Sequence, residues 1–259
     1  MSKMRDYQTG VITSALATDH PFEAARRVKT LGFDVYQLAW LTKFIRENGG
    51  VAKAVDQLKD LNQDGEPKLH SICVSHSMDS DISNWVETVK EYSYLAYMLN
   101  VGMVTEHIRA IREENKEVIV AALNDILKQG RHYKVRYALE TGNESLDMMV
   151  SIAKEAEGIG FCFDPANFLQ QGISNEEIFG YLKTLKNYIF QVHIKDAKEG
   201  KFVVLGEGDL RLREFLHLLD NIGYKGPLII EDSRMPVDVR FRDIRESKDV
   251  LEKTLWSLR

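Results

Sequence analysis

The sequence predicts an α/β protein that folds as a single (β/α)8 TIM barrel. Its 259 residues are close to the roughly 250 that are typical of such a barrel. Short runs of β-branched or aromatic residues alternate with longer amphipathic stretches along the whole chain, a pattern typical of parallel strands joined by helices. We therefore expect one domain over residues 1–259.

Eight runs have the composition of strands, and they recur about every 31 residues. An open, doubly wound sheet is the alternative arrangement, but the GxGxxG fingerprint after its first strand is missing. The eight runs are GVITSA near 10, FDVYQLAW near 33, LHSICVS near 69, VGMVTEHI near 101, KVRYALE near 134, GFCFD near 160, FQVHIKD near 190 and PLIIED near 227.

The segments between these runs carry apolar residues three or four positions apart, which predicts amphipathic helices. A glycine follows several of them, and glycine can take the left-handed conformation that ends a helix. The zone 41–64 is expected to hold two short helices that are broken at Gly49 and Gly50. The glycines expected to end helices are Gly32, Gly130, Gly158 and Gly223.

Composition and charge narrow the class of protein. The formal net charge is −5, so the chain has no overall positive field to attract a nucleic acid, and we expect no such partner. The segment MSKMRDYQTG lacks the apolar core of a signal peptide, and no run of about 18 apolar residues could cross a membrane. These features favour a cytoplasmic enzyme that acts on a small molecule.

Polar residues follow four consecutive strands near the end of the predicted barrel. Glu140, Asp164, His193 and Glu231 belong to the fifth to eighth strand runs, whose carboxyl ends should share one mouth. A single acidic residue there could merely cap the next helix. Three carboxylates and an imidazole that converge need a compensating cation, and this donor set suits Mg²⁺, Mn²⁺, Co²⁺ or Zn²⁺. We therefore predict one divalent metal ion held by these four residues.

The runs ALETGN, CFDPANF, QVHIKDA, GEGD and IIEDSR resemble successive motifs of the xylose isomerase-like TIM barrel superfamily, in its sugar phosphate isomerase/epimerase branch. The resemblance implies the same four metal ligands. It also implies that Glu140 and Glu231 act as the catalytic acid and base on opposite faces of a ketose-type sugar or sugar phosphate. The expected reaction is a metal-dependent isomerisation or epimerisation through an enediolate. An inosose-type dehydratase and a hydroxypyruvate isomerase are the alternatives that the same resemblance allows.

One position departs from the pattern of many relatives, which carry histidine three residues after the sixth-strand aspartate. This chain has Asn167 there. An asparagine side chain can hydrogen-bond a substrate hydroxyl but cannot exchange a proton near neutral pH. Asn167 is therefore expected to bind substrate.

Five further residues are candidate substrate contacts. Lys195 and Lys198 follow His193, and Arg234 follows Glu231, so these cations could bind a phosphate or carboxylate. The alternative is that they are solvated loop residues. His76 and Glu106 stand at the ends of the third and fourth strand runs, where side chains can face the mouth, although core or helix-capping roles are the alternative.

Two rival functions remain on the same fold. An endonuclease IV-like nuclease gathers several metals with many more histidines, and the seven histidines and acidic balance of this chain argue against it. A non-catalytic ligand-binding barrel is the second rival, but all four predicted ligands are present. The expected partner is a small-molecule sugar or sugar phosphate, and the sequence is compatible with a homo-oligomer.

Overall fold

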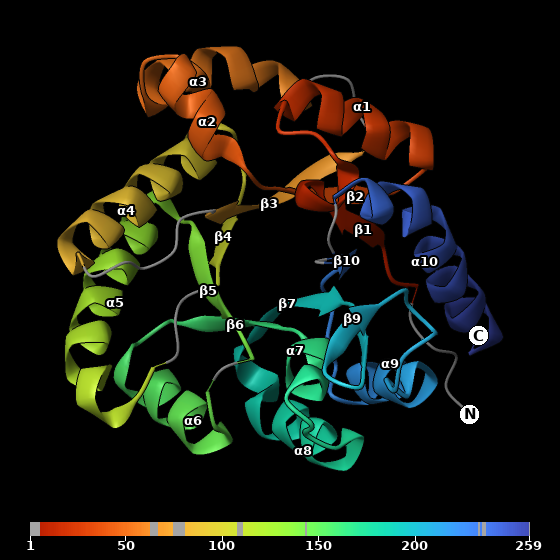
Figure 1. Cartoon of the computed structure of the whole chain (residues 1–259). Helices are drawn as coiled ribbons and strands as arrows, with labels where there is room; N and C mark the ends of the chain where they lie inside the picture. Colours follow the sequence, from red (N-terminus) through yellow and green to blue (C-terminus); the bar gives the residue numbers. More distant parts are fainter. Residues whose placement is uncertain are drawn as a thin grey trace.

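The structure is a computed structural model, and it describes residues 6–62, 67–74, 81–107, 111–142, 144–232, 234 and 237–258. Eight parallel strands close into a barrel in the order β1-β10-β7-β6-β5-β4-β3-β2. Figure 1 looks into this barrel and shows the helices arranged as a ring around it. The predicted (β/α)8 architecture is therefore confirmed.

Each of the eight predicted strand runs overlaps one barrel strand, and the bounds differ by a few residues. The strands of a parallel barrel are covered on both faces, which explains why their sequences are almost continuously apolar. The barrel strands are β1 (Thr9–Ile12), β2 (Val35–Leu38), β3 (Lys68–Val74), β4 (Met103–Glu106), β5 (Arg136–Glu140), β6 (Gly160–Phe163), β7 (Ile189–Ile194) and β10 (Leu228–Ile230).

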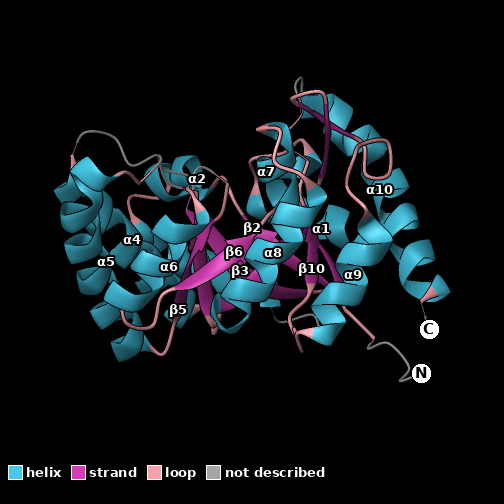
Figure 2. Cartoon of the chain, turned by 90° about the horizontal axis from the view of Figure 1, so that it is seen from below, coloured by secondary structure: helices cyan, strands magenta, loops and turns pink. Residues whose placement is uncertain are grey.

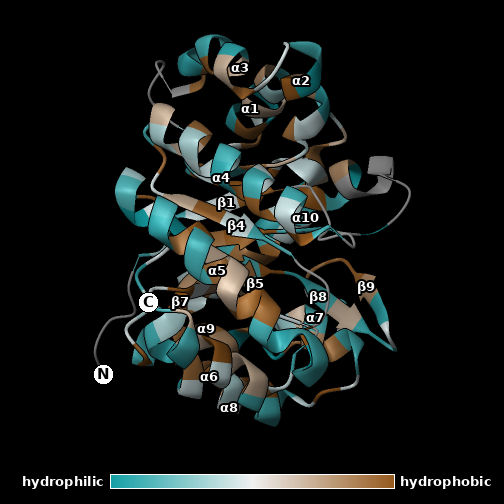
Figure 3. Cartoon of the chain, turned by 90° about the vertical axis from the view of Figure 1, so that its left-hand side faces the viewer, coloured by the Kyte–Doolittle hydropathy of each residue, from teal (hydrophilic) through white to brown (hydrophobic). Residues whose placement is uncertain are grey.

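The helices pack around the barrel and cover the outer face of its strands, as the side view of Figure 2 shows. Along α4 and α5, hydrophilic and hydrophobic residues alternate, as expected for helices with one buried face (Figure 3). The α-helices are α1 (Pro21–Leu31), α2 (Leu41–Glu47), α3 (Val51–Leu58), α4 (Ile82–Met98), α5 (Glu113–Tyr133), α6 (Leu146–Glu155), α7 (Pro165–Gln170), α8 (Asn175–Leu185), α9 (Leu212–Asn221) and α10 (Val237–Ser257), and short 3-10 helices span Thr13–Leu16 (η1), Lys59–Asn62 (η2) and Lys186–Tyr188 (η3).

The glycines behave largely as the sequence predicts. Gly49 and Gly50 separate α2 from α3 with φ values of 75° and 105°, and Gly32 ends α1 in the left-handed region. The prediction for Gly130 is wrong, because α5 continues to Tyr133 and Lys134 takes the left-handed conformation instead. Glycine is needed at position 130 for a steric reason, because a Cβ there would lie 2.7 Å from the carbonyl oxygen of Val135.

An antiparallel hairpin follows β7 and was not anticipated from the sequence. It consists of β8 (Asp196–Lys198) and β9 (Lys201–Val203) and lies outside the barrel sheet. Asp196 fixes this hairpin to the GEGD loop. Its carboxylate accepts four backbone N–H groups within 3.1 Å, from Ala197, Gly206, Gly208 and Leu210.

The pairing register of the barrel is interrupted at two places. Between β2 and β3, the register passes from Tyr36–Leu69 to Gln37–Ser71 and skips His70. Between β6 and β7, it passes from Phe161–Ile189 to Cys162–Gln191 and skips Phe190. Bulges of this kind redirect the side chain of the extra residue.

None of the described helices combines the length and the apolar character that a membrane crossing requires.

Candidate metal centre and active site

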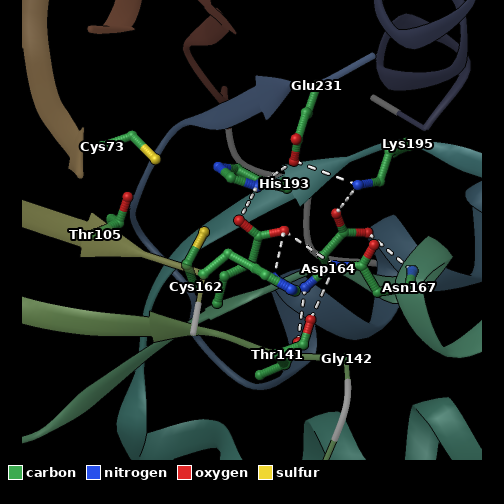
Figure 4. Close-up of polar contacts among 12 residues, drawn as sticks. Cys73, Thr105, Thr141, Gly142, Cys162, Asp164, Asn167, His193, Lys195 and Glu231 are labelled. Carbon is green, nitrogen blue, oxygen red and sulfur yellow. Dashed lines mark hydrogen bonds and ion pairs between the residues drawn. The ribbon is translucent and has the colours of Figure 1, made fainter. Parts of the chain in front are cut away.

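The four predicted metal ligands come together at the carboxyl ends of four neighbouring strands. Glu140 ends β5, Asp164 follows β6, His193 lies in β7 and Glu231 follows β10. One ligand atom from each of these residues lies within 4.8 Å of the corresponding atoms of the other three. Figure 4 shows His193 beside Glu231, with Asp164 nearby. The cluster could hold one metal ion.

The His193 ring is buried, and its orientation is fixed from the side away from the carboxylates. Its Nε2 lies 2.8 Å from Oε1 of Gln37, whose own amide nitrogen donates to Thr105 Oγ1 at 2.5 Å. Nε2 also lies 3.1 Å from the amide nitrogen of Gln191, so two glutamines hold this side of the ring. The other ring nitrogen, Nδ1, therefore faces the carboxylates, and outer contacts orient metal-binding histidines in the same way.

The surroundings of His193 Nδ1 are the strongest local indication that a cation binds in this cluster. It lies 2.9 Å from Glu231 Oε2 and 3.6 Å from Glu140 Oε2. Even so, this buried nitrogen has no hydrogen-bond partner among the described atoms. Burial alone opposes protonation of the ring, but Cys162, Glu140 and Glu231 outweigh it and raise the pKa of His193. The imidazole thus faces a strongly negative environment.

Glu140 is held in place by Asn167. The Nδ2 of Asn167 donates to Glu140 Oε1 at 2.9 Å and to the Thr141 carbonyl at 3.0 Å. Gly142 permits this approach, because a Cβ there would lie 2.4 Å from the Cβ of Asn167. Asn167 also lines the mouth cavity, and its described hydrogen bonds position the carboxylate of Glu140.

Asp164 has both roles that a carboxylate after a strand can have. Its Oδ1 caps α7 by accepting from the backbone N–H groups of Ala166 at 2.9 Å and Asn167 at 3.3 Å. Its Oδ2 lies 2.8 Å from Nζ of Lys195. Burial raises the pKa of Asp164, although Lys195 opposes this effect. Helix capping and membership of the cluster are therefore compatible at this position.

Lys195 is buried among the carboxylates. Its Nζ lies 3.4 Å from Glu231 Oε2 and 4.4 Å from the centre of the Phe202 ring, in addition to its contact with Asp164. In the state that can bind a metal, the three carboxylates are ionised and the imidazole is neutral, so three negative charges and the positive charge of Lys195 leave −2 in the cluster. A divalent cation would neutralise this charge.

A cavity of about 490 Å³ opens at this end of the barrel. The carboxylates of Glu140 and Glu231 line it together with Lys195. The aromatic side chains of Trp40 and Phe202 contribute apolar surface to its wall. The site therefore combines charged groups with apolar surface in a volume suited to a small molecule.

Two other predicted contacts, Lys198 and Arg234, do not line the mouth cavity. Lys198 is exposed in the β8–β9 hairpin, opposite Lys201, and does not line the mouth cavity. The guanidinium of Arg234 binds Asp232, with Nε 3.0 Å from both carboxylate oxygens, and contacts Asp243 at 3.1 Å. His76 lies outside the described residues.

Glu106 points away from the mouth, because successive residues of a strand face opposite sides of the barrel. Thr105 faces inward, where it contacts Gln37, so Glu106 faces the surrounding helices. Its fully buried carboxyl contacts Trp85 Nε1 in α4 at 2.9 Å and Tyr137 Oη at 2.5 Å. The next residue, His107, lies at the mouth, with Nδ1 3.8 Å from Glu140 Oε1.

We predict that Glu106→Gln will reduce the pH dependence of the free energy of unfolding. Burial raises the pKa of Glu106 from 4.5 to about 8, despite the opposing hydrogen bonds from Tyr137 and Trp85. Between these values the unfolded chain has released this proton while the folded chain retains it, so stability falls as pH rises and levels off above about pH 8. With about 1.4 kcal/mol for each pKa unit, the loss approaches about 5 kcal/mol.

The measurement is urea unfolding of the parent and of Glu106→Gln from about pH 5 to pH 8. The exposed Glu207→Gln is the control, because it makes the same substitution outside this cluster. We expect the downward slope to become shallower only in the Glu106 variant. Parallel stability profiles for the parent and this variant would contradict the assignment.

Several residues of the site were not identified from the sequence. Gln37, which orients His193, is 156 residues away from it in the chain. Trp40 and Phe202 are single aromatic residues without a motif. The sequence places both Glu106 and His107 at the end of the fourth strand run, and the prediction favoured Glu106. The only sequence signal that favours His107 is that successive side chains of β4 face alternately into and out of the barrel.

Comparisons with known proteins agree with this architecture. The family model described as the xylose isomerase-like TIM barrel matches residues 25–254, and the chain belongs to this family. No curated protein matched the sequence. Three solved structures are similar over nearly their whole length: a xylose isomerase domain protein from Planctomyces limnophilus (22% identity, TM-score 0.79, 98% of both chains), D-psicose 3-epimerase with D-tagatose from Clostridium cellulolyticum H10 (18%, 0.75, 96% of this chain and 99% of that one), and IolI protein with a binding zinc atom (18%, 0.75, 97% of both).

Proposed function

We propose that the protein is a divalent-metal-dependent isomerase or epimerase that acts on a ketose-type sugar or sugar phosphate by proton transfer through an enediolate. The main support is the placement of Glu140 and Glu231. Both carboxylates line the same cavity, and both lie within 3.6 Å of His193 Nδ1. Because β7 and β6 separate β10 from β5 in the barrel, the two carboxylates enter the cavity from different directions.

The residues of the cluster fit a divalent ion. Glu140, Asp164, Glu231 and Nδ1 of His193 would be its ligands. The buried Nδ1 that faces two carboxylates and the charge of −2 in the metal-binding state both support this assignment. Three carboxylates and one imidazole are compatible with Mn²⁺, Mg²⁺, Co²⁺ or Zn²⁺. When bound, such an ion polarises a substrate carbonyl and stabilises the negative charge that develops on its oxygen.

The proton transfers would be performed by the chain itself. One of the two glutamates removes the proton from the carbon next to the carbonyl, which produces the enediolate, and the other returns a proton. Return to the same carbon from the opposite face inverts it, whereas return to the neighbouring carbon isomerises the sugar. Asn167 holds Oε1 of Glu140 at 2.9 Å, which leaves Oε2 directed towards His193. Trp40 and Phe202 would cover apolar C–H faces of the sugar and exclude water.

Two similar structures support this reading by what their names state. One is a 3-epimerase with a bound ketose, and the other contains a zinc atom. A dehydratase of the inosose type and a hydroxypyruvate isomerase require the same first step, the removal of a proton next to a carbonyl. The two reactions differ in the next step, because the isomerase returns the proton to the neighbouring carbon whereas the dehydratase expels a neighbouring hydroxyl as water.

We predict metal-dependent incorporation of deuterium from D₂O into a ketose-type substrate. The protein is loaded separately with each of the four metals and incubated with ketoses, ketose phosphates, hydroxypyruvate and inososes. Mass spectrometry and NMR then locate the exchanged carbon. Exchange with inversion identifies an epimerase, exchange with carbonyl migration identifies an isomerase, and loss of water identifies a dehydratase. Lack of any metal-dependent exchange or conversion across the panel would contradict the proposal.

A further inference from the structure

A second charged cavity lies at the opposite end of the barrel from the metal centre. It has a volume of about 360 Å³ and is lined by Arg136, Lys186, Lys225 and His70. Arg136 begins β5, the strand that Glu140 ends, so the two residues mark opposite ends of one strand. Lys186 begins η3, immediately before β7, and Lys225 precedes β10. We call this feature the amino-end cavity.

The charged side chains that line the amino-end cavity are positive among its described residues. None of its described lining residues is acidic. Arg136, Lys186 and Lys225 also form no ion pair with any described carboxylate. Gathering like charges around one cavity raises the free energy of the folded protein unless an anion compensates them.

The two register interruptions of the barrel both occur at this cavity. His70 and Phe190 are the residues that the strand pairing skips, and both line its wall. Gly160 makes room for the Phe190 ring, because a Cβ there would lie 2.0 Å from a ring carbon. The guanidinium of Arg136 lies 5.0 Å from the centre of that ring. Arg136 is thus held against a fixed aromatic surface, which lowers the entropy lost when it binds a ligand.

His70 contributes a buried polar atom without a protein partner. Its Nε2 is inaccessible to solvent and forms no hydrogen bond with any described atom. Burial, assisted by the charge of Arg136, lowers the pKa of His70 to about 4, so the ring is neutral at neutral pH. The neutral ring adds no charge to the wall, so the charge of the amino-end cavity comes from Arg136, Lys186 and Lys225.

We propose that the amino-end cavity binds a phosphate group, either as inorganic phosphate or as a phosphate monoester, at a site separate from the metal centre. Three cations match the charge of a phosphate dianion better than that of a single carboxylate. The planar guanidinium of Arg136 suits two phosphate oxygens, and the lysines supply further charge. A bound phosphate would join the amino ends of β3, β5 and β7 to the loop before β10, and so would stabilise the barrel.

The test is titration of the metal-free full-length chain with inorganic phosphate, followed by calorimetry and thermal unfolding at constant ionic strength with sodium chloride as reference. β-Glycerophosphate is titrated in parallel, to separate a preference for the ester from one for the free ion. We expect saturable binding and a rise in Tm that follows the phosphate concentration. Lys186→Gln and Lys225→Gln change exposed side chains, and each should weaken binding about tenfold.

Lys68→Gln is the matched control. Lys68 is an exposed lysine at the amino end of β3 but does not line the cavity. It should bind phosphate as the parent does. Lack of saturable binding in the parent, parental affinity in the Lys186→Gln/Lys225→Gln double variant, or an equal loss in Lys68→Gln would each overturn the proposal. The last outcome would indicate only a general attraction of anions to this face.

Discussion

Replacing Glu140 or Glu231 with glutamine should reduce metal-dependent C–H exchange in D₂O by about 10²- to 10⁴-fold, the usual contribution of general acid–base catalysis. Glutamine preserves the size of the side chain but cannot take up or release a proton near neutral pH. At position 140 the amide oxygen can still accept the hydrogen bond from Asn167, which spans 2.9 Å in the parent. The change should therefore remove the proton transfer while leaving the local geometry nearly intact.

Both glutamates are also proposed ligands, so exchange must be compared at confirmed metal occupancy. The variants are assayed at metal concentrations that restore full loading, and bound metal is measured in the same samples. Glu207→Gln is the matched control, because it makes the same change at an exposed residue that does not line the mouth. Near-parental exchange in both glutamine variants would leave the two residues as ligands only and would end the two-glutamate mechanism.

The barrel could be predicted from the sequence because its signal is repeated. Each strand is buried on both faces, so each appears as an apolar run, and the eight repeats support one another. The β8–β9 hairpin has no such signal. Its strands are three residues long, and it depends on the carboxylate of Asp196, which binds backbone groups up to 14 residues away. A tertiary contact of this kind leaves no periodicity in the sequence.

The positions of the candidate ligands could be predicted from the sequence for a related reason. Parallel strands bring their carboxyl ends to one mouth, so a polar residue at the end of an apolar run has a predictable location. The direction of a side chain is harder to predict. Glu106 and His107 are adjacent, yet one faces helix α4 and the other faces the mouth. Lys195 and Lys198 are three residues apart, and the β8–β9 hairpin buries the first while exposing the second.

The two ends of the barrel show the same limit on inference from sequence. Arg136 and Glu140 lie on one short strand, but their charges belong to separate clusters at opposite ends. The carboxyl-end cluster contains both signs of charge, with Lys195 among the carboxylates. The amino-end cavity contains one sign only among its described lining residues. A net charge of −5 for the whole chain conceals this local positive region.

His193→Ala should weaken the binding of a divalent metal ion by more than about 100-fold, because even the loss of an outer-shell partner typically costs 10- to 100-fold. The substitution removes the buried Nδ1 that lies 2.9 Å from Glu231 Oε2 and leaves the carboxylates without the imidazole donor. Isothermal titration with Mn²⁺ or Zn²⁺, together with metal analysis after dialysis, measures the effect. Asp164→Ala should behave similarly, although it also removes the cap of α7.

His107→Ala is the control that distinguishes a histidine that binds the metal from one that only lies near the site. His107 also lies at the mouth, and its Nδ1 is 3.8 Å from Glu140 Oε1, but it is not one of the four candidate ligands. Its ring is half-exposed and so can turn away from the cluster, whereas Gln37 holds the buried ring of His193 from behind at 2.8 Å. His107→Ala should therefore retain nearly the parental metal affinity. If the two histidine variants lose metal equally, or if His193→Ala binds metal as well as the parent while remaining folded, the assignment of His193 as a ligand is wrong.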